Sequence, residues 1–431
     1  MSSPIQEGWH LLPLGEIADS RRGITYSAEM LESRENGLPY LNMKSFLKGG
    51  GFNSNGTKSY SGTYTTNDLI GDHDLLIANT DVTAGDIVGA PALLPKEFAE
   101  AKAVYSHHVT RLRLNEVIIV PFLYYLLCLP EYRSHMLRVA RGTTVLMLDM
   151  HAIKRISIIA PESKAEQRRI AEILTTLDET IVQTEALITK YQQIKAGLMH
   201  DLFTRGVTPD GRLRPTRDQA PHLYKESPLG WIPKEWEPAN IRSLTSLCID
   251  CPHTTPVLSG DGYLMARTSE IRNGKFYVEQ SPRVPPVEYR SRVSRGAPSE
   301  GDIIFTREAP VGEAFVVPAN LEICLGQRVM LMRPLRNRCD SIFLLFQIYS
   351  DRVQREFSRI TGGTTNPHLN VDDVRKFIVS LPNPSEQVEI AKRLTVAADF
   401  INSEEAKVDK LRHQKFGLMQ DLLTGRVRVA I

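Results

Sequence analysis

The chain has 431 residues, enough for two ordinary domains, and its 42% hydrophobic and 24% charged content excludes disordered, fibrous and collagen-like classes. Its formal net charge of +2 neither requires nor excludes nucleic acid, because binding depends on where basic groups cluster. Five cysteines, no apolar leader and no apolar run of membrane-spanning length predict a cytoplasmic protein without disulfides and without a membrane partner.

The first part of the chain, residues 1–161, shows short β-like runs separated by turns and is predicted to form one domain. Its longest apolar stretch, VIIVPFLYYLLCLP from Val117, contains two prolines. A counterpart, FLLFQIY from Phe343, occurs in the second half of the chain. We therefore expect a buried helix here rather than a membrane anchor.

Residues 162–205 are predicted to form one long helix. Ser163 and Glu166 have the spacing of a capping box, in which the serine oxygen accepts a backbone N–H while the glutamate reaches back. Apolar residues then alternate at intervals of four and three, which indicates a heptad seam. The apolar seam positions are Ile170, Leu174, Leu177, Ile181, Ile188, Tyr191 and Leu198.

A segment rich in Gly, Pro and charge, residues 206–229, is predicted to be a surface linker to a second domain over residues 230–382. The second domain repeats the plan of the first. The stretch from Gly142 to Pro161 aligns without a gap on the stretch from Gly363 to Pro382, and HHVTRLR from His107 aligns on QRVMLMR from Gln327. The chain is therefore predicted to be an internal duplication.

A second long helix is predicted over residues 383–426. It begins with a capping box at Asn383 and Glu386, and Pro384 stands at its first position. Its seam has the register of the first helix, with Lys195 and Lys415 on the same rung, where they should lower stability and fix the register. The apolar seam positions are Ile390, Leu394, Ile401, Val408, Leu411, Leu418 and Leu422.

The coincidence of the two registers predicts that the long helices pair with each other. The fold class is a mixed α/β protein in which two domains alternate with two long helices. An intramolecular pair could be parallel, with both domains at one end, or antiparallel, with the domains at opposite ends and related by a pseudo-two-fold repeat.

Four stretches carry a resemblance to a known family: TRGVTPDGRLRP from Thr204, ESPLGWIPKEWE from Glu226, PSEQVEIAKRL from Pro384 and GLMQDLLTGRVRV from Gly417. Together they resemble the specificity subunit of type I restriction-modification systems. The resemblance implies two target-recognition domains, each reading one half of a split double-stranded DNA site. It further implies two spacer helices that form an antiparallel intramolecular coiled coil. It also implies docking of two modification subunits, which methylate adenine, and of restriction and translocase subunits. S-adenosylmethionine, ATP and Mg²⁺ would be bound by those partners, and this chain would carry no cofactor.

The second domain resembles the family in DCPHTTP from Asp250, GYLMARTSEIRNGKF from Gly262, GDIIFTREAPVGEA from Gly301 and LGQRVMLMRP from Leu325, and the first domain departs from it. We expect the two domains to read different half-sites. The guanidinium of Arg can form two hydrogen bonds with guanine, and the amides of Asn and Gln can do so with adenine. Hydroxyl and backbone N–H groups commonly bind phosphates. On that chemistry the candidate DNA contacts of the second domain are His253, Thr254, Thr255, Arg267, Thr268, Arg307, Gln327, Arg328, Thr364, Thr365 and Asn366. Those of the first domain are Arg21, Arg22, Thr25, Tyr26, Asn79, Thr80, His107, His108, Arg141, Thr143 and Thr144.

The sequence offers no catalytic residue that we would assign. It has no Asn/Asp-Pro-Pro-aromatic motif, no glycine-rich loop after a strand for S-adenosylmethionine and no G-x-x-x-x-G-K-[ST] loop for ATP. Glu405-Ala-Lys407 is expected to be an exposed helix face, and the cysteines lack the two close pairs of a structural zinc site, so no metal is predicted. Two alternatives remain: a self-contained DNA-modifying enzyme, and a coiled-coil adaptor that does not read DNA.

Overall fold

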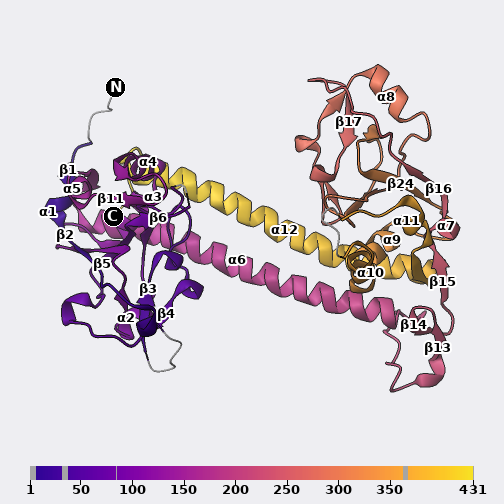
Figure 1. Cartoon of the computed structure of the whole chain (residues 1–431), viewed down its shortest axis with the longest axis horizontal. Helices are drawn as coiled ribbons and strands as arrows, with labels where there is room; N and C mark the ends of the chain where they lie inside the picture. The colour runs from indigo at the N-terminus through magenta and orange to yellow at the C-terminus, as the bar shows by residue number, and fades with distance from the viewer. Residues whose placement is uncertain (1–5, 32–36, 84, 363–366, 431) are drawn as a thin grey trace. The chain divides into compact units, whose positions relative to one another are not determined.

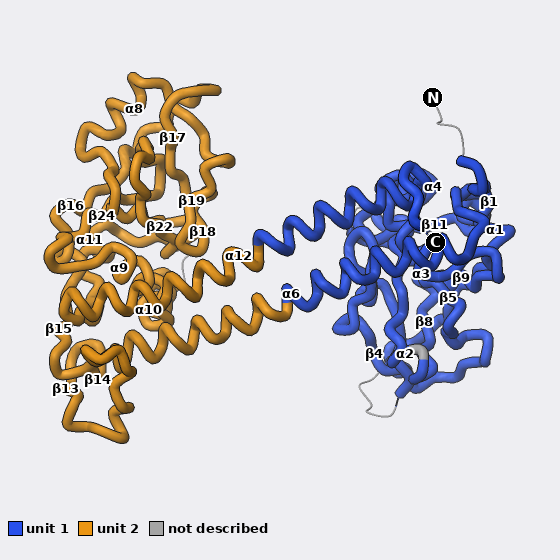
Figure 2. Tube along the Cα trace, turned by 180° about the vertical axis from the view of Figure 1, so that it is seen from behind, with its two compact units in different colours: residues 1–185, 406–431 blue, residues 186–405 orange. Residues whose placement is uncertain are grey.

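The computed structural model of the chain describes residues 6–31, 37–83, 85–362 and 367–430 (Figure 1). The chain divides into two compact units. Unit 1 comprises Met1–Glu185 with Ala406–Ile431, and unit 2 comprises Ala186–Glu405 (Figure 2). Each unit therefore contains one sheet domain and one part of each long helix.

The central sheet of unit 1 is built from β2 (Ala18–Arg22), β5 (Asp74–Ala78), β7 (Pro91–Ala92) and β9 (Val109–Leu114). The strands are antiparallel in the order β2-β9-β5-β7. All five residues of β5 are buried, and β9 is buried except at Arg113. These two strands are central in the sheet, which explains the apolar run of β5 and the burial of β9, including its Thr110 and Arg111.

Three smaller sheets complete unit 1, with strands β1 (Trp9–Pro13), β3 (Leu38–Leu41), β4 (Lys58–Tyr60), β6 (Thr80–Asp81), β8 (Val104–Tyr105), β10 (Ala140–Arg141), β11 (Leu146–Leu148) and β12 (Ser157–Pro161). β3 pairs antiparallel with β4 and parallel with β8. β11 lies between β10 and β6, and β1 pairs antiparallel with β12.

The short helices of unit 1 are α1 (Leu14–Ile17), α2 (Lys96–Glu100), α3 (Val120–Cys128), α4 (Pro130–Val139) and α5 (Met150–Lys154). α3 is the buried helix that the apolar stretch predicts. Phe122 and Leu123 are fully buried in the core with Leu75 and Leu112 of the sheet. Pro121 lies in the first turn of α3, where its missing N–H costs no helical hydrogen bond.

Unit 2 repeats this plan with a central sheet of β16 (Thr245–Asp250), β21 (Ile303–Thr306), β22 (Ala314–Val316) and β24 (Val329–Pro334). Its order, β16-β24-β21-β22, matches that of unit 1. The smaller strands are β13 (Tyr224–Ser227), β14 (Gly230–Pro233), β15 (Glu237–Asn240), β17 (Tyr263–Ala266), β18 (Ile271–Arg272), β19 (Lys275–Phe276), β20 (Arg283–Val284), β23 (Ile323–Leu325) and β25 (Ile378–Leu381). β17 pairs antiparallel with β20 and parallel with β23, as β3 does with β4 and β8.

The short helices of unit 2 are α7 (Ile241–Leu244), α8 (Pro286–Arg292), α9 (Ser341–Ile348), α10 (Asp351–Thr361) and α11 (Val371–Lys376). α9, like α3, packs its buried aromatic and leucine side chains into the core of its unit. The shared strand order and the matching helices confirm the predicted internal duplication.

The two long helices are α6 (Lys164–Thr204), with 41 residues, and α12 (Pro384–Leu422), with 39 residues. In unit 1, Ile170 and Leu174 near the start of α6 share a core with Leu422 at the end of α12. In unit 2, Leu202 near the end of α6 shares a core with Ile390 near the start of α12. The pairing is therefore antiparallel in each unit. Every predicted seam residue is buried or half-buried.

Both seam lysines, Lys195 and Lys415, have interaction partners. The Lys415 ammonium donates to Asp178 Oδ1 at 2.5 Å and lies 5.3 Å from the centre of the Tyr125 ring. Lys195 lies 5.6 Å from the centre of the Phe346 ring. Burial lowers the pKa of Lys195. Each lysine thus contacts an aromatic ring of α3 or α9, so partners offset the expected loss of stability.

The start of each long helix is capped only in part as predicted. Ser163 Oγ accepts from Glu166 N at 3.3 Å, and Asn383 Oδ1 accepts from Glu386 N at 3.0 Å. The two glutamates do not follow the capping-box prediction, because Glu166 binds Arg428 and Glu386 is used within unit 2. α12 also ends at Leu422, earlier than predicted, and Gly425 beyond it has a φ of +73°.

The predicted surface linker is a folded element. β13 and β14 form a hairpin, and Arg214 before it is buried. Across the described residues, no helix is long and apolar enough to cross a membrane.

Candidate nucleic-acid interface

In unit 1 the ends of several strands meet at one border of the domain. Gly23 N, just after β2, donates to Val109 O at 3.2 Å, and Asn79 N, just after β5, donates to His108 O at 2.8 Å. β9 runs opposite to β2 and β5, so its start lies beside their ends. We call this border edge 1, and it comprises residues 22–26, 42–44, 79–80, 105–108 and 147–148.

Unit 2 has the same border with the same backbone bonds. Cys251 N, just after β16, donates to Val329 O at 3.2 Å, and Arg307 N, just after β21, donates to Arg328 O at 2.9 Å. We call it edge 2, and it comprises residues 250–255, 267–270, 307–308, 326–328 and 368–369. The backbone frame is thus repeated, while the side chains that it carries differ.

Edge 2 is charged. Arg307 Nε and Nη2 each donate to Asp250 at 3.0 Å, and the Arg307 side chain is only 8% exposed. His253 Nε2 lies 3.1 Å from the same carboxylate, although its ring is largely in solvent. The structure therefore corrects the prediction of Arg307 as an open donor for a base, since its guanidinium is buried and already paired.

The open donors of edge 2 are Arg267, Gln327 and Arg328. Gln327 is exposed, and the Arg328 side chain is 55% exposed with its Nε 3.7 Å from Glu308. Arg267 binds Glu270 at 2.7 Å and keeps 42% of its side chain exposed. Arg328 has a φ of +69°, a left-handed conformation that is uncommon for any residue but glycine. Such strain persists only where the surroundings hold it, and it concentrates at functional sites.

Edge 1 is aromatic and carries less charge. The rings of His107 and His108 lie 3.9 Å apart, and Tyr26 lies 5.9 Å from His107. Thr80 Oγ1 is 2.9 Å from His108 Nδ1. Burial, and then the neighbouring His107, lower the pKa of His108, which favours a neutral ring near pH 7. A neutral imidazole with a half-buried face can both hydrogen-bond and make apolar contacts with a base.

Two further predicted contacts of unit 1 lie behind the edge. Asn79 is fully buried and Thr80 is 1% exposed, so the structure corrects the prediction that they are open donors. Arg22 Nη2 donates to Leu148 O at 3.2 Å. Arg21 pairs with Asp68 at 2.9 Å.

The remaining predicted contacts lie on exposed loops. Thr25, Thr254 and Thr255 are exposed, and Thr268 is half-buried. Arg141, Thr143 and Thr144 belong to the β10–β11 hairpin and are also exposed; β11 continues to β6 beside edge 1. Thr364 and Thr365, the counterparts of Thr143 and Thr144, lie outside the described residues, as does Asn366.

The sequence did not single out three residues: Asp250 in edge 2, Met43 in edge 1, and Arg292, which contacts Thr254 of edge 2. Asp250 is the partner of Arg307, and Met43 Sδ lies 3.0 Å from Thr80 Oγ1. Arg292 looks like part of a basic surface cluster, but it is buried and donates to Thr254 O at 2.9 Å. The sequence carries no signal for these contacts, because the equivalence of Arg22 with Asp250 and of Asn79 with Arg307 follows from the strand pairing.

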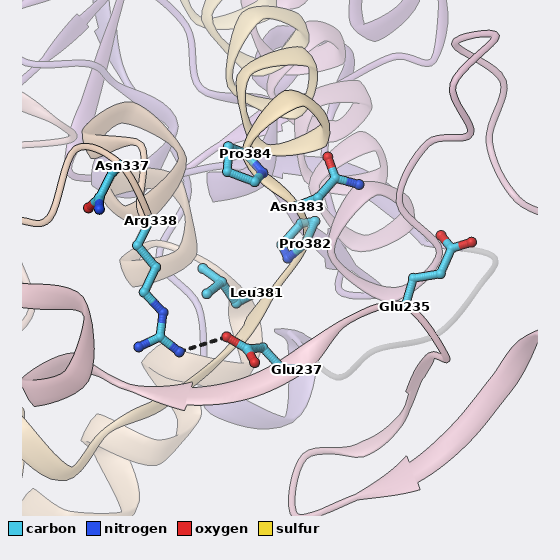
Figure 3. A pocket seen from close by; sticks show the side chains of 8 residues that line it. All are labelled: Glu235, Glu237, Asn337, Arg338, Leu381, Pro382, Asn383 and Pro384. Carbon is cyan, nitrogen blue, oxygen red and sulfur yellow. Dashed lines mark hydrogen bonds and ion pairs between the residues drawn. The ribbon is translucent and has the colours of Figure 1, made fainter.

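The structure contains other polar sites that do not support chemistry. Among the described residues no group of three or more His, Cys, Asp or Glu side chains could hold a metal ion. A hollow of about 270 Å³ lies where β15, β25 and the start of α12 meet, and Figure 3 shows its lining. Arg338 and Glu237 pair with each other across it at 2.7 Å. It shares no residue with edge 2.

Two copies of one sheet domain, each with a border rich in hydrogen-bonding side chains, define an internally duplicated α/β protein. The chain belongs to the family of the type I restriction modification DNA specificity domain, whose model matches residues 6–196 and 292–413. It is a DNA-recognition chain, and specificity subunits of this family are not catalytic by themselves.

Relatives of known type match nearly the whole chain. The chain is 23% identical to the Type I restriction enzyme MjaVIII specificity subunit of Methanocaldococcus jannaschii, over 99% of this chain and 94% of the relative. It is 22% identical to the Type I restriction enzyme EcoBI specificity subunit of Escherichia coli, over 98% of this chain and 86% of the relative.

Solved structures share the fold. The crystal structure of the type I restriction-modification S subunit from M. genitalium matches with a TM-score of 0.59 and 13% identity, over 98% of this chain and 97% of that chain. A chain from a study of complex assembly and conformational transition of the type I system matches with a TM-score of 0.54 and 17% identity, over 99% of this chain and 100% of that chain.

Proposed function

We propose that this chain reads a bipartite double-stranded DNA site, one half with edge 1 and the other with edge 2. The observation that carries the proposal is the repeated backbone frame with different side chains at equivalent positions. His108 stands in edge 1 where Arg328 stands in edge 2, and each follows a residue, His107 or Gln327, that also faces the border. One frame with two sets of side chains suits two half-sites of different sequence.

The chemistry of the edges favours different bases. Arg328 can offer a planar fork to guanine O6 and N7 in the major groove, whereas Arg267, whose Nε and Nη2 donate to Glu270, suits single hydrogen bonds. Edge 1 offers Tyr26, His107 and His108 instead, which suit apolar contact and single hydrogen bonds. The exposed hydroxyls of Thr143 and Thr254 suit phosphates, which position the domain but do not specify sequence.

The long helices also carry large exposed apolar side chains, which are compatible with contacts to partner subunits. They are Val182, Leu187 and Ile194 on α6, and Val388, Val396 and Phe416 on α12. Two modification subunits dock there in this proposal, and restriction and translocase subunits join the same complex. S-adenosylmethionine, ATP and Mg²⁺ are bound by those subunits, and the complex works in the cytoplasm.

DNA titration of the chain together with its modification subunits tests the proposal at two salt concentrations. Phosphate contacts make the affinity fall steeply as salt rises, so the apparent Kd for a target duplex should increase strongly between about 50 and 200 mM salt. A duplex of scrambled sequence is the control and should bind more weakly at both concentrations. Weak binding of both duplexes without salt dependence would contradict the proposal.

A further inference from the structure

We infer that Asp250 and Arg307 form a brace behind edge 2, which positions the base-reading loops without touching a base. The inference rests on the proposed function, in which edge 2 reads one half-site. Arg307 uses Nε and Nη2 on Asp250 and Nη1 on Leu369 O at 2.9 Å. A guanidinium with these contacts and little exposure has no open fork for guanine.

The brace fixes three segments of edge 2 at once. Asp250 is the last residue of β16, and Arg307 directly follows the last residue of β21. The backbone of Arg307 donates to Arg328 O at 2.9 Å and accepts from Leu369 N at 2.9 Å. Arg328, which holds the unusual φ of +69°, is therefore tied directly to the brace. Leu369 is tied to it by both a backbone and a side-chain bond.

Edge 1 has a brace at the same positions with different chemistry. Arg22 and Asp250 end equivalent strands and pair with Thr110 and Met330. Asn79 N and Arg307 N donate to the equivalent carbonyls of His108 and Arg328, so the two side-chain pairs occupy equivalent positions. When the side-chain amide of Asn79 has its oxygen toward Arg22, this oxygen accepts a hydrogen bond from Arg22 Nε at 3.2 Å. The amide nitrogen then donates to Leu148 O at 3.2 Å. Leu148 N donates in turn to Asn79 O at 2.9 Å.

Leu148 and Leu369 occupy equivalent places, just before α5 and just before α11. In both units one side-chain pair therefore joins the ends of two sheet strands to this leucine. The arginine of the pair lies on β2 in unit 1 and after β21 in unit 2. The same two positions therefore interact in both units, although different residue types occupy them. A pair selected for base contact would not need the same leucine carbonyl in both domains.

The decisive experiment compares Arg307→Ala and Asp250→Ala in the full chain with its modification subunits. Selection of bound sequences from a random duplex pool measures base preference. Amide hydrogen exchange measures how readily the backbone hydrogen bonds of edge 2 open. Both variants should weaken every position of one half-site together and leave the other half unchanged. The amide of Leu369 should exchange at least about tenfold faster in both, because a buried charge without its partner favours local opening. Arg359→Ala, which removes an exposed ion pair with Glu356 on α10, should change neither measurement.

A rescue variant separates positioning from a merely structural loss. The double change Asp250→Arg with Arg307→Asn installs the pair of edge 1 in edge 2. It should recover protection of Leu369 and most of the half-site affinity relative to Arg307→Ala. If Arg307→Ala does not fold, Arg307→Lys, which keeps the charge but loses the fork, should give an intermediate loss in both measurements.

Two results would overturn the inference. One is relaxation at a single base pair in Arg307→Ala with unchanged exchange, which would make Arg307 a base reader. The other is unchanged exchange in both single variants. If the unaltered complex binds no DNA, the proposed function fails, while the exchange measurements still decide whether the brace exists.

Discussion

Replacement of Glu386 by alanine should destabilise unit 2 strongly, because buried donors from three residues in two segments converge on its carboxylate. Val207 N donates to it at 2.8 Å, Trp236 Nε1 at 3.1 Å and Arg214 Nη2 at 3.0 Å, with a further bond from Arg214 Nη1. The donors come from the segment after α6 and from the segment before β15. Glu386 therefore ties both to the first turn of α12.

The magnitude follows from what the substitution leaves behind. The Arg214 side chain is only 6% exposed and would lose its buried partner. Removal of one member of a buried ion pair costs about 3–5 kcal/mol. Arg214 also binds the largely exposed Glu235 at 2.7 Å, and this contact remains. We therefore expect a loss of unfolding free energy toward the lower end of that range, and a smaller loss for Glu386→Gln, which keeps the shape.

Glu166→Ala is the matched control in unit 1. Glu166 is buried and binds Arg428, but the Arg428 side chain is half exposed and can return to water. Its removal should cost clearly less than that of Glu386. Denaturant unfolding followed by tryptophan fluorescence, together with calorimetry, measures both losses. The unfolding free energy could instead fall by less than about 1 kcal/mol in Glu386→Ala, or by more in Glu166→Ala than in Glu386→Ala. Either result would refute the argument that the burial of the remaining arginine sets the cost.

Three further predictions concern the helices and edge 1. Changing Leu177 and Ile181 to Asp places unpaired charges in the seam, so the variant should lose solubility or co-purification with its modification subunits; normal co-purification would count against the pairing. Because burial lowers the pKa of His108 in the folded chain, the unfolded chain gains the proton more readily as the pH falls. Unit 1 should thus lose stability as the pH drops through about 6.5, and His108→Asn should reduce that loss in thermal unfolding at pH 7.5 and 5.5. Insertion of seven residues after Glu185 should lengthen α6 by roughly 10 Å at 1.5 Å per residue and widen the gap between half-sites by about one to three base pairs, as methylation mapping would show; an unchanged gap would mean that the helices do not set the spacing.

The repeat and the long helices could be predicted from the sequence because both depend on local or periodic signals. The seam from Ile170 onward and that from Ile390 onward follow the heptad spacing, and their shared register predicts that the two helices pair. The capping oxygens of Ser163 and Asn383 also depend only on neighbours three residues away. The glutamates of the same motifs could not be assigned, because their partners lie far along the chain.

The sequence indicates which residues lie at the edges, but not which of them face outward and which support the others. Alignment of the two halves brings His108 and Arg328 to one position, which the structure places at the border of each domain. Arg307 was interpreted as an open donor because its type suits guanine. Its burial depends on Asp250, 57 residues earlier, and only the sheet brings the two together. Donor chemistry alone therefore does not separate a residue that faces DNA from one that supports it.

Selection of bound sequences from a random duplex pool, with the full chain and its modification subunits, tests the central claim most directly. The account predicts two short specific halves separated by a non-specific gap, with centres near one helical turn apart, about 10 base pairs. Arg328→Ala should relax a base in one half only, at a cost of about 1–3 kcal/mol. One uninterrupted site, no preferred sequence, or equal relaxation of both halves in this variant would contradict the account.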